Sequence, residues 1–167
     1  MSSLARGQFL DRSTPPNIFT LILLAGVSAL CMNIFLPSLP SMTEYFDTDY
    51  GVMQLSIAVY LAVNAVLQIV VGPISDKFGR RPVILAGLAI FLAATIGCIY
   101  APNAAVFLTF RMLQAAVVVA MVLSRAVVRD MVSADEAASM IGYVTMGMTV
   151  VPMLGPALGG LLDSAFG

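Results

Sequence analysis

Five long apolar stretches alternate with short polar segments along the 167-residue chain. Because an α-helix rises 1.5 Å per residue, about 20 apolar residues are needed to cross the hydrocarbon core of a bilayer. The pattern therefore predicts five transmembrane helices, flanked by a terminal segment at residues 1–17 and a short tail at residues 163–167. The predicted spans are Ile18 to Leu36, Gly51 to Val71, Val83 to Tyr100, Ala104 to Leu123 and Ala137 to Leu162.

The first stretch is interpreted as a retained helix and not as a cleaved signal peptide. Its apolar part is longer than the core of a signal peptide, and Pro37 and Pro40 follow it where small residues would mark a cleavage site. The third span carries few polar side chains apart from Thr95 and Cys98, which indicates a helix that faces mostly lipid.

Lysine and arginine predict the orientation of these helices. Basic residues fall before the first span, between the second and third, and after the fourth, whereas the alternate segments contain none. By the positive-inside rule, the first segment is cytoplasmic and the tail at residues 163–167 lies outside. The basic residues used here are Arg6, Arg12, Lys77, Arg80, Arg81, Arg125 and Arg129.

Composition excludes most other classes of protein. Hydrophobic residues make up 60% of the chain and charged residues 10%, and the mean hydropathy is +0.98. A net charge of -1 without a basic tail gives no basis for nucleic-acid binding. The chain has no histidine, and no motif indicates a catalytic nucleophile, a nucleotide, a metal or another cofactor, so an enzyme is not expected.

Polar side chains inside the second span share one face. Tyr60, Asn64 and Gln68 recur at every fourth position, which stacks them along the helix. Two interpretations stay open for this stripe: hydrogen bonding between helices, which is worth about 0.6 to 2 kcal/mol, or the lining of a cavity.

Arg111 lies about seven residues into the fourth span, on the order of 10 Å below the outer interface. An arginine at the bilayer centre costs about 2.5 to 3.5 kcal/mol on insertion scales, so this side chain is expected to face inward and to have a partner. Snorkelling to the headgroups is the alternative. Gln114 lies one turn further on and shares the face of Arg111.

A charged segment separates the second and third spans and is predicted to be a cytoplasmic hairpin, because such charges are costly near hydrocarbon. Its spacing, Gly-x3-Asp-Lys-x-Gly-Arg-Arg, resembles the signature loop of the major facilitator superfamily of secondary transporters. The resemblance implies that its acid belongs to a charge cluster at the inner end of the fourth helix, where Asp130 is the nearest match. The matching residues are Gly72, Asp76, Lys77, Gly79, Arg80 and Arg81.

Further segments resemble the same family in the same order. Arg111-Met-Leu-Gln114 is similar to the family's fourth-helix motif, which implies a role for Arg111 in proton coupling. The segment from Asn33 to Pro40 resembles the Bcr/CflA drug exporters, with Asn33 where those exporters often have aspartate. The fifth span resembles the family's antiporter motif, carried here by Gly147, Gly155, Pro156, Gly159 and Gly160.

The resemblance implies an all-α membrane protein with the fold of the N-terminal half of such a transporter, of which five helices are present. It implies a multi-pass protein of the bacterial inner membrane that exports small amphipathic drugs against protons, together with a second helix bundle that this sequence does not contain. The expected cavity residues are Asn33, Tyr60, Asn64 and Gln68. The alternatives are a non-transporting five-helix fragment and a structural or interaction protein.

Overall fold

The computed structural model describes residues 17–166, and within them the chain folds into helices joined by short connections. Five helical spans are long and apolar enough to cross a membrane, as the sequence predicts. Two of these spans contain a short 3₁₀ segment. The elements are α1 (Ile18–Asn33), η1 (Leu36–Ser38), α2 (Leu39–Tyr45), α3 (Tyr50–Phe78), α4 (Arg80–Ile99), α5 (Ala104–Gln114), η2 (Ala115–Val117), α6 (Val118–Met131) and α7 (Ala134–Phe166).

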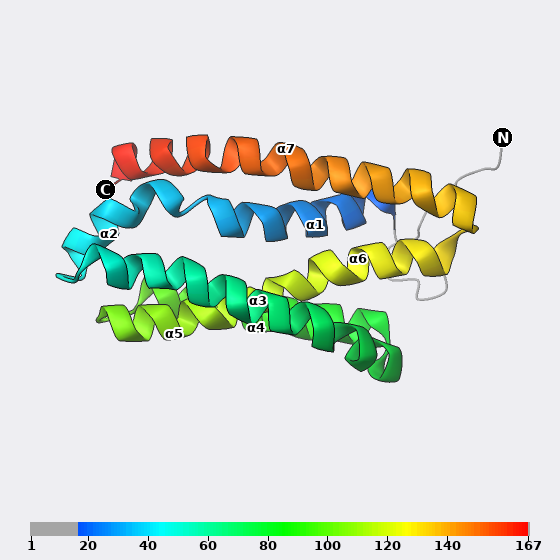
Figure 1. Ribbon diagram of the computed structural model, residues 1–167, viewed down its shortest axis with the longest axis horizontal. Coiled ribbons are helices and arrows are strands. Elements are labelled where there is room, and N and C mark those ends of the chain that lie inside the picture. The colour runs from blue at the N-terminus through cyan, green and yellow to red at the C-terminus, as the bar shows by residue number, and fades with distance from the viewer. Residues whose placement is uncertain (1–16, 167) are drawn as a thin grey trace.

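The spans run up and down along one long axis (Figure 1), and successive spans therefore begin at opposite ends of the bundle. The α3–α4 and α6–α7 turns lie at one end, which we call the basic end because it carries Lys77, Arg80, Arg81 and Arg129. The opposite end holds α2, the α4–α5 turn and the end of α7, and its described residues include no lysine or arginine.

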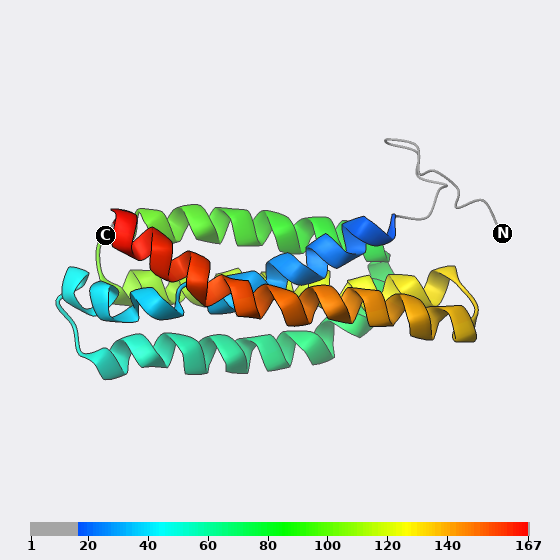
Figure 2. The same cartoon turned by 90° about the horizontal axis from the view of Figure 1, so that it is seen from above.

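The α5–η2–α6 span lies at the centre of the packing. In its most apolar window 56% of the residues are buried, against 11 to 22% in the windows of the other four spans. Helix α7 packs along α1, and the two views agree on this arrangement (Figures 1 and 2). The arginine-bearing helix is therefore surrounded by other helices of the same chain.

The first span continues beyond its predicted end at Leu36. Helix α1 ends at Asn33, after which η1 and α2 carry the helical path on to Tyr45. The two prolines do not stop it, because each falls in the first turn of its own helical segment, where the missing N–H has no helical partner to lose.

The predicted hairpin between the second and third spans is present, but its connection is shorter than the sequence predicts. Helix α3 extends to Phe78 and α4 begins at Arg80, so most of the charged segment is helical and Gly79 alone separates the two helices. The backbone of Gly79 has φ 91°, a conformation that residues with a Cβ rarely adopt. A glycine at this position therefore makes the abrupt turn possible.

The other differences concern helix ends. The fourth span extends to Met131 and is interrupted by η2, so Arg125 and Asp130 lie on a helix. The predicted tail at 163–167 is wrong as far as Phe166, because α7 continues to that residue. There Asp163 accepts a hydrogen bond from the Ser41 hydroxyl, at 3.1 Å. The predicted terminal segment at residues 1–17, with Arg6 and Arg12, falls outside the described residues except for Asn17.

Candidate functional site: a buried arginine beside a cavity

Arg111 is the most buried charged residue of the described chain, with 5% of its surface exposed. It lies in the last turn of α5, whose start is fixed by the Asn103 side chain accepting a hydrogen bond from Val106 N–H. The guanidinium donates from Nη1 to Gln114 Oε1 at 2.7 Å and from Nη2 to the Cys31 carbonyl at 2.9 Å. Gln114, which the sequence places on the same helix face, is therefore in direct contact with Arg111.

Two aromatic rings flank the same guanidinium. Its Cζ lies 3.8 Å from the centroid of Phe35 and 4.6 Å from that of Tyr60, within the range of cation–π attraction. Phe35 follows α1 and Tyr60 belongs to α3. Tyr60 is only 2% exposed, so it is held against Arg111.

Gln114 extends this network to α4. Its Nε2 donates to Thr95 Oγ1 at 2.9 Å, and the Thr95 hydroxyl donates in turn to the Phe91 carbonyl. Half of the residues of α4 are exposed and only two are buried, as expected for a lipid-facing helix, but Thr95 contacts the interior network. The sequence marks Thr95 as one of the few polar residues of this span, which is the signal that would have identified it.

The described side chains provide no carboxylate to Arg111, since the ion pairs among them belong to Arg80. Arg111 Nε is buried and has no hydrogen-bond partner. A buried charge is normally paired, because desolvation of an unpaired one is expensive. Arg111 is therefore a buried cation held by neutral groups, and its Nε–H donor has no partner.

A cavity of about 450 Å³ lies next to this network, between α1, α3, α6 and α7. Three of the four predicted cavity residues, Asn33, Asn64 and Gln68, line it, and Gln68 Nε2 donates to Asn64 Oδ1 at 3.3 Å. Tyr60 does not line it, because its side chain packs on Arg111 instead. The remaining lining includes the thioethers of Met32, Met121 and Met148.

A second charged group lies at the basic end, where Arg80 joins two carboxylates. Its Nη1 lies 2.8 Å from Asp76 Oδ1 and its Nε 3.1 Å from Asp130 Oδ2. Arg80 also contacts the Ser75 hydroxyl. These contacts connect the α3–α4 turn to α6, whereas Lys77 and Arg81 of the same motif are exposed.

The glycines of α7 allow its close approach to α1. A Cβ built on Gly147 would lie 2.7 Å from Ile22 Cγ2, and one built on Gly155 would lie 3.3 Å from Asn33 Cβ. One built on Gly159 would overlap the backbone carbonyl of Ile34. Gly160, next to it, has Pro37 as its neighbour at 3.9 Å, and α7 remains helical through Pro156.

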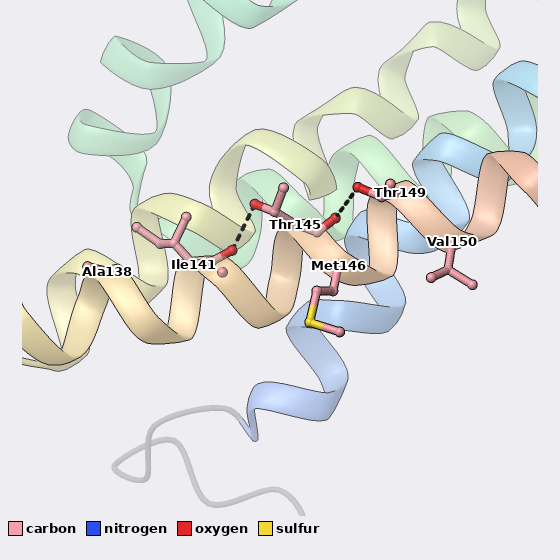
Figure 3. Close-up of a pocket in the computed structure, with 7 residues that line it drawn as sticks. Ala138, Ile141, Thr145, Met146, Thr149 and Val150 are labelled. Carbon is pink, nitrogen blue, oxygen red and sulfur yellow. Dashed lines mark hydrogen bonds between the residues drawn. The ribbon is translucent and has the colours of Figure 1, made fainter.

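A shallow groove runs along the outer side of α7 (Figure 3), and all of its lining residues belong to that helix. Its hydroxyl groups bond back to their own helix, Thr145 to the Ile141 carbonyl at 2.8 Å and Thr149 to the Thr145 carbonyl at 3.0 Å. Their donors are therefore already used. Met146 lies here, on the exposed side of α7, and not in the cavity beside Arg111.

The chain is similar to several known proteins. Multidrug resistance protein D of Escherichia coli is 32% identical over 148 residues, which cover 88% of this chain and 38% of that protein. A chloramphenicol resistance protein of Pseudomonas aeruginosa is 36% identical over 84% of this chain and 34% of its own length. The MFS antiporter QDR2 of Candida albicans is 31% identical over 93% of this chain and 32% of its own length.

The chain spans about a third of the length of these curated relatives. Residues 21–167 match the sequence profile described as Major Facilitator Superfamily, and this match includes the buried arginine, the Arg80 ion pairs and the glycines of α7. The chain is a multi-pass membrane protein that belongs to the Major Facilitator Superfamily.

Proposed function

We propose that this chain forms the N-terminal helix bundle of a proton-coupled exporter of small amphipathic molecules. In this proposal the protein resides in the cytoplasmic membrane of a bacterium, with the basic end of the bundle in the cytoplasm. A second bundle, supplied by further sequence or by another chain, completes the substrate site, because transporters of this kind bind substrate between two bundles near the bilayer midplane.

The names of the relatives support export of drugs. Two of them are named for resistance, to multiple drugs and to chloramphenicol, and a third is named an antiporter. The cavity supports the same proposal, because amides and thioethers suit an amphipathic ligand that offers both apolar surface and hydrogen-bonding groups.

The environment of Arg111 is the main observation that supports proton coupling. A permanent cation is held in the membrane interior by a carbonyl, an amide and two rings, without a carboxylate among the described side chains. Such a residue raises the energetic cost of any nearby cation and lowers that of any nearby anion. It can therefore favour the deprotonated form of an acid in the second bundle, which is the property that proton coupling needs.

The ion pairs of Arg80 suggest a cytoplasmic gate. They join the ends of α3, α4 and α6 through partly exposed charges. Contacts of this kind are individually weak, about 0.2 to 1 kcal/mol, and can therefore be broken and remade as the bundles move.

The test uses the full-length gene product in inverted membrane vesicles, with chloramphenicol as the probe and an imposed pH gradient as the driving force. Wild-type protein should accumulate the probe only while the gradient exists. Arg111→Lys keeps the charge but loses the planar fork of donors. We expect it to bind the probe while its gradient-driven uptake falls about tenfold or more, the equivalent of ~1.4 kcal/mol.

Arg129→Lys is the matched control, because the same substitution is made at an exposed position of α6. It should transport as the wild type does. Equal transport and an identical pH profile for Arg111→Lys would remove Arg111 from the coupling mechanism. Absence of any gradient-driven uptake by the wild type would reject the exporter itself.

A further inference from the structure

The lining of the cavity beside Arg111 contains no ionisable side chain among its described residues. Its polar groups are the amides of Asn33, Asn64 and Gln68 and the hydroxyl of Ser28. Asn33 Nδ2 donates to the Ala29 carbonyl at 2.8 Å, and the Ser28 hydroxyl contacts the Leu24 and Val117 carbonyls. The cavity therefore offers hydrogen bonds to a ligand but no charge of either sign.

Two arginines contact residues that line the cavity or that are next to the lining in sequence. Arg111 Nη2 binds the carbonyl of Cys31, whose neighbours in sequence, Met32 and Asn33, line the cavity. Arg125 Nη2 lies 3.2 Å from the sulfur of Met148, which lines the cavity from α7. The Nε atoms of both arginines are buried and have no hydrogen-bond partner. Two cations with spare donors therefore flank the same space.

No described acid forms an ion pair with either arginine. The acids occupy the ends of helices or the connections between them, and those that form ion pairs at the basic end are bound to Arg80. None occurs within the part of a span that lies beside the cavity. The acids whose side chains the structure describes are Glu44, Asp47, Asp49, Asp76, Asp130, Glu136 and Asp163.

We infer that this bundle selects against lipophilic cations and accepts uncharged amphipathic molecules that carry hydrogen-bonding groups. A cation in the cavity would lose its hydration and gain no carboxylate from this bundle, and it would be repelled by Arg111 and Arg125 in a medium of low dielectric constant. An uncharged ligand avoids the loss of charge hydration and the repulsion by the arginines. It can also form hydrogen bonds with the amide groups of the lining. Selection of this kind depends on a repulsive element as much as on attraction.

This inference rests on the proposed function, and its test separates the two. The full-length gene product in inverted vesicles is given two probes in turn: chloramphenicol, which is uncharged, and tetraphenylphosphonium, a permanent lipophilic cation. We expect gradient-driven accumulation of chloramphenicol and at least tenfold less of tetraphenylphosphonium. Comparable accumulation of the cation would overturn the inference and leave the exporter intact. Failure with both probes would reject the exporter and the inference with it.

Asn33→Asp tests the cause, because it adds one negative charge to the cavity at nearly constant size. It should increase tetraphenylphosphonium accumulation at least tenfold, whereas Asn33→Leu, the uncharged control, should not. Asn64→Asp, from the α3 side of the cavity, repeats the test at a second position in case Asn33→Asp is absent from the membrane. If neither aspartate variant that reaches the membrane gains cation transport, the charge of the lining does not control selectivity and the inference is wrong.

Discussion

At position 111 the chain places a permanent cation among groups that carry no full charge. Its depth in the span predicts an inward-facing residue, and the spacing to Gln114 predicts their contact on one helix face. Polarity marks Thr95 in the sequence, but its contact with Gln114 and that of the Cys31 carbonyl with Arg111 could not be predicted from spacing, because they join different helices. Local spacing identifies neighbours within a helix, whereas contacts between helices depend on packing.

Tyr60 is a second case in which spacing along a helix does not predict contacts between helices. The four-residue spacing groups it correctly with Asn64 and Gln68 on α3. Only the position of α5 decides that Tyr60 meets Arg111 while the two amides line the cavity. A periodic pattern defines a face, but the neighbouring helices divide that face into different environments.

The Arg80 ion pairs lead to a prediction about single carboxylates. In the full-length gene product, Asp76→Asn and Asp130→Asn should each reduce drug export by about fivefold or more, at the low end of typical coupling energies of 1–3 kcal/mol. Both proteins should still reach the membrane, because exposed ion pairs contribute only about 0.2 to 1 kcal/mol to stability. Export from intact cells is measured against the amount of protein in isolated membranes.

Glu136→Gln is the control for this pair, since it removes an exposed acid near the start of α7, at the same end of the bundle. It should export as the wild type does. Wild-type export by both aspartate variants at normal expression would exclude the Arg80 ion pairs from gating.

At the scale of helices, hydropathy predicts the existence and order of the spans but not where they end. Charged residues beyond the apolar part of a span can still belong to its helix. Helices α3 and α6 therefore continue past their apolar parts to Phe78 and Met131. The prolines after α1 look like an end in sequence, yet each begins a new helical segment. Helix ends depend on backbone geometry, which hydropathy does not describe. At Gly79, for example, the end of α3 is marked by a positive φ angle.

The close contact between α1 and α7 leads to a prediction about stability. Gly159→Ala places a methyl group on the backbone of Ile34, which cannot move as a side chain can. Overpacking of this kind typically costs about 1–3 kcal/mol, so the variant should unfold at a lower temperature in detergent than the wild type. The measurement is thermal unfolding of the purified full-length gene product, followed by loss of helical signal.

Gly142→Ala is the matched control on the same helix, because no atom lies within 4 Å of the added Cβ. Its unfolding temperature should be equal to or above that of the wild type, since alanine is favoured over glycine inside helices by about 0.8–1.0 kcal/mol. Equal behaviour of the two variants would show that the close approach of α7 to α1 does not contribute to stability.

For the whole molecule, the segregation of charge is the property most completely predicted from sequence. The up-and-down path of the spans brings Lys77, Arg80, Arg81 and Arg129 to one end and leaves the described residues of the other end without lysine or arginine. The positive-inside rule then predicts that the basic end lies in the cytoplasm. The sequence identifies three polar residues of the cavity, Asn33, Asn64 and Gln68, but the arrangement of four spans around it depends on how those spans pack.

The orientation predicts which positions a membrane-impermeant thiol reagent can reach from outside the cell. In a background without Cys31 and Cys98, single cysteines at Thr48 and Asn103 should be labelled, because both lie in connections at the end without basic residues. A cysteine at Phe78, next to the α3–α4 turn, should be labelled only after the membrane is opened. Phe78 is 63% exposed, so lack of labelling in intact cells reflects the bilayer and not burial in the protein. Labelling of Phe78 alone in intact cells would reverse the orientation, and with it the assignment of the Arg80 ion pairs to the cytoplasmic side.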